Sequence, residues 1–234
     1  MKNKILIFAA TYNEAGNIKS FLDSINNLNL DIDLLIIDDN SPDKTWRIIQ
    51  NYSTGKKNIH LILRDKKEGL DTAHKTAFDY SIKNNYDLLI TMDADLSHDP
   101  KAIPQFINEL TTNAFVIGSR YIAGGKNDMK GFRLLLSILG NKIIKFSFKI
   151  DCTEYTSSYR GFNLREIGNF NLNTVSSKGY SFFMETIFQI NKQGIKIKQI
   201  PIYARQRGKG KSKIARIELL RTLLNVLRLK FRKN

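Results

Sequence analysis

Cysteine is almost absent from this chain of 234 residues, since Cys152 is the only one. A single cysteine excludes an intramolecular disulfide framework, and we expect Cys152 to be a small buried apolar residue in a reducing compartment. Long apolar runs are also missing, because no stretch approaches the roughly 18 residues of a membrane-spanning helix. Residues 1–4 lead directly into a short apolar run, without the pattern of a secretory signal. We therefore expect a cytoplasmic protein that does not cross the membrane.

Acidic residues are scarce in the second half of the chain. Residues 1–110 contain 13 Lys and Arg against 16 Asp and Glu, whereas residues 111–234 contain 24 against 6. The first half is thus slightly acidic and the second strongly basic, which gives the net charge of +15. Such an asymmetry predicts a partner that carries phosphates, either nucleic acid or an anionic membrane surface.

Short apolar runs alternate with amphipathic segments over the first 120 residues, and this alternation predicts a parallel sheet covered on both faces. The expected strands are 5–9, 34–37, 59–63, 88–92 and 115–117. The expected helices lie near 14–28, 43–53, 71–85 and 100–111. Two of them have start signals, because Ser41-Pro42 and Asp99-Pro100 each place a capping side chain before a first-turn proline.

Polar clusters follow four of the predicted strands. They are residues 10–14, 38–42, 93–99 and 118–121. In open α/β sheets, ligands bind beyond the carboxyl ends of the strands. We therefore expect all four clusters to meet at one edge of the sheet and to form the functional site.

Asp93 and Asp95 are the most informative pair in these clusters. Two carboxylates this close repel each other unless a cation lies between them, and hard oxygen ligands suit Mg²⁺ or Mn²⁺. The alternative is an acidic start to the helix at Asp99-Pro100, where negative charge is merely favourable. Their position directly after a buried strand favours the metal.

The clusters after the first and second strands are suited to a nucleoside. Asp38 and Asp39 offer acceptors for a ribose or a base, and Thr11, Tyr12 and Glu14 would wall the pocket. The structural alternatives are an Asx-turn that opens a helix for the aspartates and a first-turn helix acid for Glu14.

Together these motifs resemble the inverting family 2 glycosyltransferases, and most closely the dolichyl- and polyprenyl-phosphate mannose synthases. The resemblance continues through the second half of the chain. The matching segments are 10–14, 38–43, 92–100, 118–121, 156–162, 177–180, Glu185, 200–202 and the basic run from Arg207 to Lys213.

The resemblance implies an α/β protein of GT-A fold, with a Rossmann-like, mostly parallel sheet that has helices on both faces. The residue pattern adds amphipathic helices toward the C-terminus. It implies that Mg²⁺ or Mn²⁺ binds to Asp93 and Asp95. The donor site would comprise Ala10, Thr11, Tyr12, Glu14, Asp38, Asp39 and Asp93. The catalytic groups would be Asp95, Arg120, Arg207 and Lys213, and the acceptor phosphate would lie near Arg133 and Ser157. The alternative for each basic residue is a solvated surface charge.

Three residues depart from the family pattern. Ser158 and Asp71 stand where glycine is common, and Ile138 stands where an arginine near the lipid phosphate is frequent. These departures leave the donor and metal assignment intact and bear on the acceptor.

Two segments of the basic half have the pattern of interfacial helices. Segments 131–150 and 214–232 each combine an apolar stripe with Lys or Arg on another face. The alternative is that each stripe packs on the core. We predict a core at 1–130, an acceptor half at 131–213 and a membrane-surface helix at 214–234. The protein would lie on the inner face of the membrane, and the absence of a nucleic-acid recognition motif argues against RNA or DNA as a partner.

The predicted reaction is hexose transfer from a nucleotide-diphosphate sugar to a lipid-linked phosphate. A phosphate is already anionic, so no strong general base is required, and His98 is expected to be structural. If the acceptor were instead a glycan hydroxyl, Glu185 or Asp151 would have to take its proton. A nucleotidyltransferase is a further alternative, because it also uses a carboxylate-bound metal.

Overall fold

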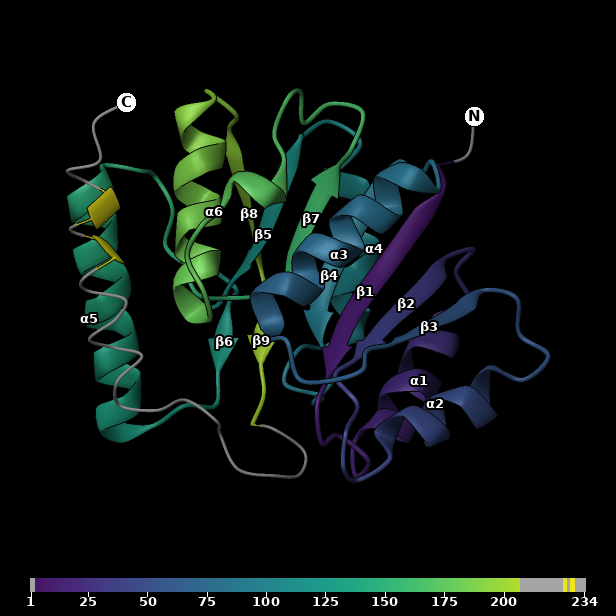
Figure 1. The fold of residues 1–234 in the computed structure, drawn as a ribbon. Coiled ribbons are helices and arrows are strands. Elements are labelled where there is room, and N and C mark those ends of the chain that lie inside the picture. The colour runs from purple at the N-terminus through teal and green to yellow at the C-terminus, as the bar shows by residue number, and fades with distance from the viewer. Residues whose placement is uncertain (1–2, 207–224, 227, 230–234) are drawn as a thin grey trace.

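The computed structural model describes residues 3–206, 225–226 and 228–229, except for the side chain of Arg133. Seven strands form one sheet in the order β3-β2-β1-β4-β7-β5-β8 (Figure 1). Their bounds are β1 Ile5–Thr11, β2 Asp33–Asp38, β3 Ile59–Leu63, β4 Leu88–Asp93, β5 Phe115–Ser119, β7 Arg160–Asn163 and β8 Ile197–Pro201. A second, two-stranded sheet pairs β6 Lys126–Asn127 with β9 Tyr203–Ala204.

The described helices are α1 Ile18–Asn26, α2 Thr45–Ser53, α3 Leu70–Lys83, α4 Ile103–Glu109, α5 Gly131–Phe148 and α6 Tyr180–Lys192. Two short 3-10 helices, η1 Pro100–Ala102 and η2 Leu172–Thr174, complete these elements. Every strand and helix expected in the first 120 residues is present, so this part of the prediction is confirmed.

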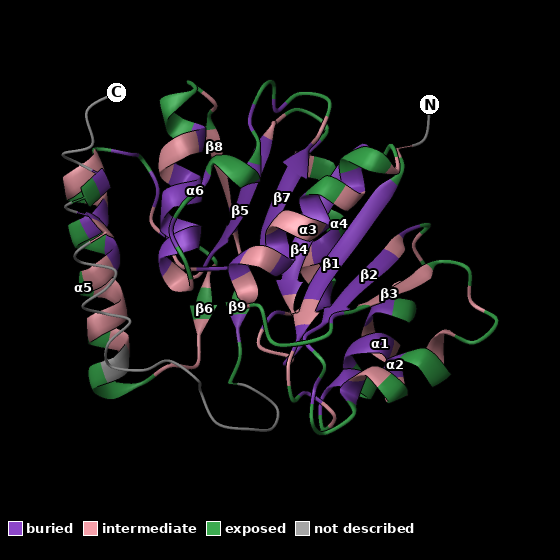
Figure 2. Cartoon of the chain, in the orientation of Figure 1, coloured by how far each residue is buried: buried purple, intermediate pink, exposed green. Residues whose placement is uncertain are grey.

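Alternation along the strands divides the core into two layers. In β1, Leu6 and Phe8 pack into a cluster with α3 and α6, whereas Ile5, Ile7 and Ala9 face a second cluster with α1 and α4. Helices therefore cover both faces of the sheet, as expected for strands that are apolar on both sides. Figure 2 shows the central strands buried between these helices.

The sheet is parallel except at β7, which runs antiparallel to both of its neighbours, β4 and β5. β7 was not predicted, because its only large apolar side chain is that of Phe162. Gly161 allows close packing here, since a Cβ on it would lie 2.7 Å from Leu110 Cδ1 on the adjoining helical layer. The carboxyl ends of β1, β2, β4 and β5 still meet at one edge of the sheet, as predicted.

One predicted helix start is wrong. α2 begins at Thr45 rather than after Ser41-Pro42, and its N-cap residue is Lys44 in the left-handed region (φ 60°). The Ser41 hydroxyl instead donates to Asp38 Oδ2 at 2.7 Å and accepts from the Asn13 N–H at 3.0 Å. These contacts hold Ser41 in the turn after β2. At the other predicted start, Asp99 does cap, because its Oδ1 accepts from the Lys101 N–H at 3.1 Å.

The two amphipathic segments are partly described. α5 has a buried side that includes Asn141 and Ile144, and an opposite exposed apolar stripe. Of 214–234, only residues 225, 226, 228 and 229 are described; these are helical, and Val226 and Leu229 are buried in the same core cluster as Ile144. In the described part of the chain, no helix has both the length and the apolar character that crossing a bilayer requires.

Candidate active site

The parallel register places the ends of three strands side by side. Ala10 lies opposite Asp93 of β4, and Thr11 lies opposite Asp38 of β2. The Thr11 hydroxyl donates to Asp38 Oδ2 at 2.7 Å. The end of β1 therefore connects the predicted nucleoside residues on one side with the predicted metal residues on the other.

Asp38 is fully buried and shapes the turn after β2. Its Oδ1 accepts from the Ser41 N–H at 2.8 Å, and its Oδ2 accepts from the hydroxyls of Ser41 and Thr11. This is the Asx-type turn weighed above as the structural alternative. Both carboxylate oxygens of Asp38 are thus engaged in holding the turn after β2 and the end of β1.

Asp39 binds a neighbouring loop. Its Oδ1 accepts from Arg64 Nη1 at 3.1 Å, and its Oδ2 accepts from the N–H groups of Glu68 and Gly69 at 3.2 and 3.1 Å. Three donors on one carboxylate hold residues 64–69 against the end of β2. The same loop carries Lys67, whose ammonium lies 4.1 Å from the centre of the Tyr12 ring. The Tyr12 ring, which was predicted to wall the nucleoside pocket, is therefore in contact with a cation.

Glu14 lies at the start of the α1 region. Its Oε2 accepts from Asn17 Nδ2 at 2.8 Å, and its N–H donates to the Thr45 hydroxyl at 2.9 Å. These contacts tie the segment after β1 to the start of α2.

Asp93 ends β4, and Asp95 lies in the turn that follows it. Asp93 is the last residue of the strand, its side chain is 40% exposed, and its Oδ1 accepts from the Ser158 hydroxyl at 2.7 Å. Asp95 is buried, and its Oδ1 accepts from the Ser97 N–H at 3.0 Å. Leu96 adopts the left-handed region (φ 67°), which turns the chain back toward the sheet.

His98 supports this turn. Its Nδ1 accepts from the Asp93 N–H at 3.1 Å, so this nitrogen carries no proton, and its 3.9 Å approach to Asp93 Oδ2 is not an ion pair. The His98 ring stacks on Tyr159 with centroids 5.0 Å apart, and Tyr159 stacks on Phe106 in turn. His98 therefore acts as a structural support for the carboxylate turn.

The donor set suits a hard divalent cation. Asp93 and Asp95 are both carboxylates, and one of them is open to solvent at the edge where a phosphate could approach. Among the described residues, no group of three or more His, Cys, Asp or Glu could hold a metal. A pair of carboxylates fits Mg²⁺ or Mn²⁺ bound jointly to protein, phosphate oxygens and water.

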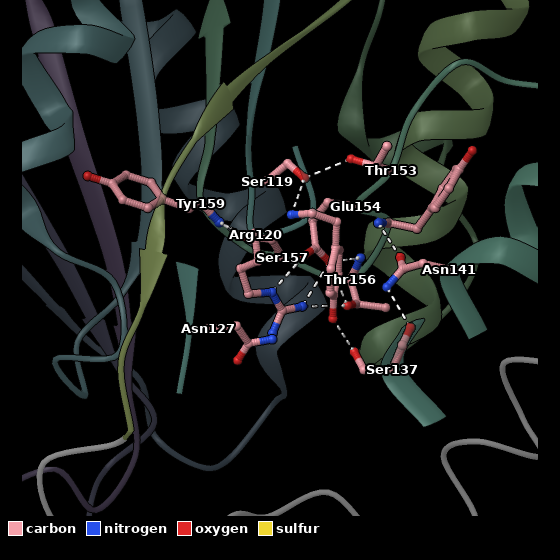
Figure 3. A network of polar contacts seen from close by, with 12 residues as sticks. Ser119, Arg120, Asn127, Ser137, Asn141, Thr153, Glu154, Thr156, Ser157 and Tyr159 are labelled. Atoms are coloured by element: carbon pink, nitrogen blue, oxygen red, sulfur yellow. Dashed lines mark hydrogen bonds and ion pairs between the residues drawn. The ribbon is translucent and has the colours of Figure 1, made fainter. Parts of the chain in front are cut away.

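Arg120 follows β5 and pairs with Glu154 (Figure 3). Its Nε lies 2.7 Å from Glu154 Oε2 and its Nη2 lies 2.9 Å from Glu154 Oε1. Glu154 also accepts from Thr156, through both its N–H and its hydroxyl. Arg120, one of the predicted catalytic groups, is thus held by an acid that was not predicted from the sequence. The sequence does contain a signal for this residue, because Glu154 is one of only six acids in the basic half of the chain.

The same network reaches α5. The Tyr121 and Ser137 hydroxyls lie 2.7 Å apart, and Asn141 Oδ1 accepts from the Tyr155 N–H at 2.8 Å. Two residues of α5 are therefore joined to the segments on either side of the Arg120–Glu154 pair (Figure 3).

Ser157, predicted near the acceptor phosphate, uses its hydroxyl to accept from the Tyr159 N–H at 3.1 Å. Its carbonyl accepts from Arg160 Nε at 2.8 Å. Arg160 is fully buried, and burial lowers the pKa of its guanidinium to about 9. Its Nη1 has no hydrogen-bond partner within the described part of the chain.

Three predicted site residues have side chains outside the described residues. Arg133 is in the first turn of α5, while Arg207 and Lys213 lie in the undescribed segment after Gln206. The chain just before that segment is anchored at the site. Arg205 Nη2 lies 2.6 Å from Asp99 Oδ2, and the Arg205 N–H donates to the Ser97 carbonyl at 2.9 Å. Arg207 thus follows a segment fixed beside the carboxylate turn.

Residues 6–167 match the family described as Glycosyl transferase family 2. The chain belongs to this family. It is a glycosyltransferase of the GT-A type, and the predicted family and fold class are confirmed, whereas the C-terminal amphipathic helix stays a prediction.

Among curated relatives of this glycosyltransferase, undecaprenyl-phosphate mannosyltransferase of Micrococcus luteus is 29% identical over 96% of this chain and 93% of its own. Polyprenol monophosphomannose synthase of Mycolicibacterium smegmatis is 28% identical over 91% of this chain and 81% of its own. Among solved structures, glucosyl-3-phosphoglycerate synthase of Mycobacterium tuberculosis, in complex with Mn²⁺ and UDP, has a TM-score of 0.69 at 17% identity. That alignment covers 97% of this chain and 80% of the other, and it shows a shared fold.

Proposed function

We propose that this glycosyltransferase moves a hexose, of the mannose type, from a nucleotide-diphosphate sugar to a polyprenyl phosphate at the inner face of the membrane. The observation that carries the proposal is the carboxylate pair Asp93 and Asp95 at the sheet edge, one strand away from the Thr11–Asp38 contact. The two curated relatives support the sugar and the acceptor, because their names specify mannosyl transfer and lipid phosphates.

The donor would bind across the ends of β2, β1 and β4. The loop held by Asp39 would close over the nucleoside, and Ala10, Tyr12 and Glu14 would border it. Asp93 and Asp95 would hold Mg²⁺ or Mn²⁺, which supplies positive charge to the departing diphosphate. Arg207 and Lys213 would add further positive charge from the segment that follows Gln206.

The acceptor oxygen attacks the anomeric carbon as the bond from that carbon to the diphosphate oxygen breaks, so a single displacement inverts the configuration. A phosphate acceptor already carries the required negative charge. The two residues considered as bases for a hydroxyl acceptor support this choice. Glu185 is fully buried and accepts from Ser176 and Ser177, while the side chain of Asp151 is 97% exposed and pairs with Lys145.

The pKa of Glu185 also argues against its use as a general base at neutral pH. Burial alone would raise it, but hydrogen bonds from Ser177 and Ser176 lower it below its ordinary value. The turn at Ser176 and Ser177 stabilises the charged form of Glu185, and the Glu185 carboxylate in return holds this turn in place. The Arg120–Glu154 pair, Arg133 and Ser157 would instead border the acceptor phosphate.

The exposed stripe of α5 supports a membrane location. Its apolar side chains are 39–86% exposed and recur at three- and four-residue intervals: Phe132, Leu135, Leu139, Ile143 and Phe146. Lys130, Lys142 and Lys149 are exposed on the same helix or at its ends. Apolar side chains with lysines beside them match an anionic lipid surface, where each basic residue contributes on the order of 1 kcal/mol. We also propose that the chain is divided into a core at 1–130, an acceptor half at 131–213 and a membrane-surface helix at 214–234.

A donor panel tests the proposal directly. Purified protein would be incubated with radiolabelled GDP-mannose, GDP-glucose or UDP-glucose and a polyprenyl phosphate, with Mn²⁺, with Mg²⁺ or with EDTA. We expect label in the lipid phase only when both a divalent metal and the lipid phosphate are present. Asp95→Asn should abolish transfer, while Asp23→Asn, an exposed acid on α1 paired with Lys19, should not.

Other outcomes would overturn the proposal. Transfer to a glycan hydroxyl but not to the lipid phosphate would identify a polysaccharide-type transferase. Pyrophosphate release from a nucleoside triphosphate would identify a nucleotidyltransferase. Full turnover in EDTA, or in Asp95→Asn, would refute the metal-centred mechanism.

A further inference from the structure

Ser158 lies between the carboxylate turn and β7, and it is held on both sides. Its carbonyl accepts from the Thr91 hydroxyl, and its own hydroxyl donates to Asp93 Oδ1 at 2.7 Å. Thr91 and Asp93 are two residues apart on β4 and therefore lie on the same face of the strand. Ser158 is only 4% exposed, so its hydroxyl has a fixed position against the strand end.

Asp93 needs such a contact because its side chain is 40% exposed at the end of a strand. Within the described residues, Ser158 is the one side chain that donates a hydrogen bond to the Asp93 carboxylate. His98 fixes the Asp93 backbone but donates nothing to the carboxylate, since its Nδ1 is itself an acceptor. Without Ser158, the carboxylate would be free to change rotamer.

The contact also distinguishes the two oxygens of Asp93. Oδ1 is engaged by the hydroxyl, and Oδ2 accepts no hydrogen bond from the described residues. In the family pattern that residues 156–162 resemble, glycine is expected at this position, and glycine has no side chain to make the bond. The hydroxyl is therefore a property of this chain's own sequence.

We propose that Ser158 is a positioning residue for the metal: it fixes Asp93 so that Oδ2 is presented to the divalent cation. This inference rests on the proposed function, since it takes Asp93 as a metal ligand. Residues that orient a ligand commonly change metal affinity by 10- to 100-fold when they are removed. Ser158→Ala should therefore weaken Mn²⁺ binding by about 10-fold, and Ser158→Gly should weaken it at least as much.

The experiment measures Mn²⁺ binding directly, by the loss of the free Mn²⁺ EPR signal in the presence of GDP or UDP. The variants are Ser158→Ala, Ser158→Gly, Asp93→Asn and the double variant Asp93→Asn with Ser158→Ala. Ser181→Ala is a matched control, because Ser181 is equally buried and its hydroxyl has no partner in the described part of the chain. Thermal unfolding confirms that each variant is folded, and Ser158→Gly serves if Ser158→Ala is not.

Three results support the inference together: weaker Mn²⁺ binding in the single variant, no further loss in the double variant, and a normal Ser181→Ala. In the transfer assay, the Mn²⁺ concentration at half-maximal rate should rise while kcat at saturating Mn²⁺ changes little. Unchanged or tighter Mn²⁺ binding by Ser158→Ala would overturn the inference, as would additive losses in the double variant. If the wild-type protein itself bound no Mn²⁺ with either nucleotide, the proposed function would fail first.

Discussion

Arg120 and Glu154 form a two-point ion pair, with Nε–Oε2 and Nη2–Oε1 distances of 2.7 and 2.9 Å. Glu154 is fully buried, while the Arg120 side chain keeps 15% of its surface exposed. Most of the Arg120 side chain is therefore buried beside the acid that neutralises its charge. The two contacts from Glu154 set where the guanidinium lies.

Removing the Glu154 carboxylate should therefore destabilise the fold. Glu154→Gln leaves Arg120 without its counter-charge, and breaking a buried pair in this way lowers the free energy of unfolding by about 3–5 kcal/mol. Urea denaturation measures the change. Asp151→Asn is the control, because the Lys145–Asp151 pair is exposed and its loss should leave the urea midpoint unchanged. Equal stability of Glu154→Gln and wild type would show that the pair is not important for folding.

Asp39 should control donor affinity more than the rate of chemistry. Its carboxylate holds the N–H groups of Glu68 and Gly69 and pairs with Arg64, so it positions the loop that would cover the nucleoside. Asp39→Asn should raise the KM for the nucleotide sugar about 10-fold, equivalent to about 1.4 kcal/mol, with a smaller effect on kcat. Asp65→Asn is the control on the same loop, because Asp65 is exposed. A fall in kcat with an unchanged KM would contradict this role.

Stability should fall in mild acid because of His74. This histidine is buried among Phe8, Phe182 and Phe183, and burial, aided by the nearby Arg160 charge, lowers its pKa from 6.5 to about 3. The unfolded chain therefore binds a proton that the folded chain excludes between those two pH values. The contribution is complete above pH 6.5 and is lost as the pH falls toward 3.

Between pH 7 and pH 5 the loss should be about 2 kcal/mol. The measurement is the difference in the free energy of unfolding between the two pH values, for wild type and for His74→Leu. The variant should show a smaller loss, because it has no imidazole to protonate on unfolding. If both proteins had the same pH dependence, His74 would not be the group responsible.

Local sequence pattern was sufficient for the first 120 residues, because strands buried on both faces read as continuous apolar runs. The rule that ligands bind at strand ends then placed residues 10–14, 38–42 and 93–99 at one edge. The contacts that fix them were not predictable. Ser158 reaches Asp93 from 65 positions away in the chain, and only the antiparallel insertion of β7 brings it there.

The predicted helix start at Ser41-Pro42 is wrong because of tertiary contacts as well. Serine before proline is a good start signal for a helix, but the hydroxyl of Ser41 is used by Asp38 and Asn13 instead. Where a residue fits two competing local motifs, its tertiary contacts decide which of the two forms. β7 was missed for the converse reason, because Arg160-Gly161-Phe162-Asn163 lacks an apolar pattern and is buried only through its neighbours.

The α5 stripe should bind lipid. Phe132 and Phe146 are 72% and 86% exposed, and fully burying such a side chain stabilises by about 1.5–3 kcal/mol. Replacing both with serine should weaken binding to anionic vesicles by at least about 100-fold in co-sedimentation. Ile82→Ser is the control, because Ile82 is 51% exposed on α3 and lies outside the stripe. Transfer to a short water-soluble acceptor phosphate should persist in the double variant, since both side chains are exposed to solvent and neither is a predicted site residue. Vesicle binding that survives both serine substitutions would show that α5 does not contact the membrane.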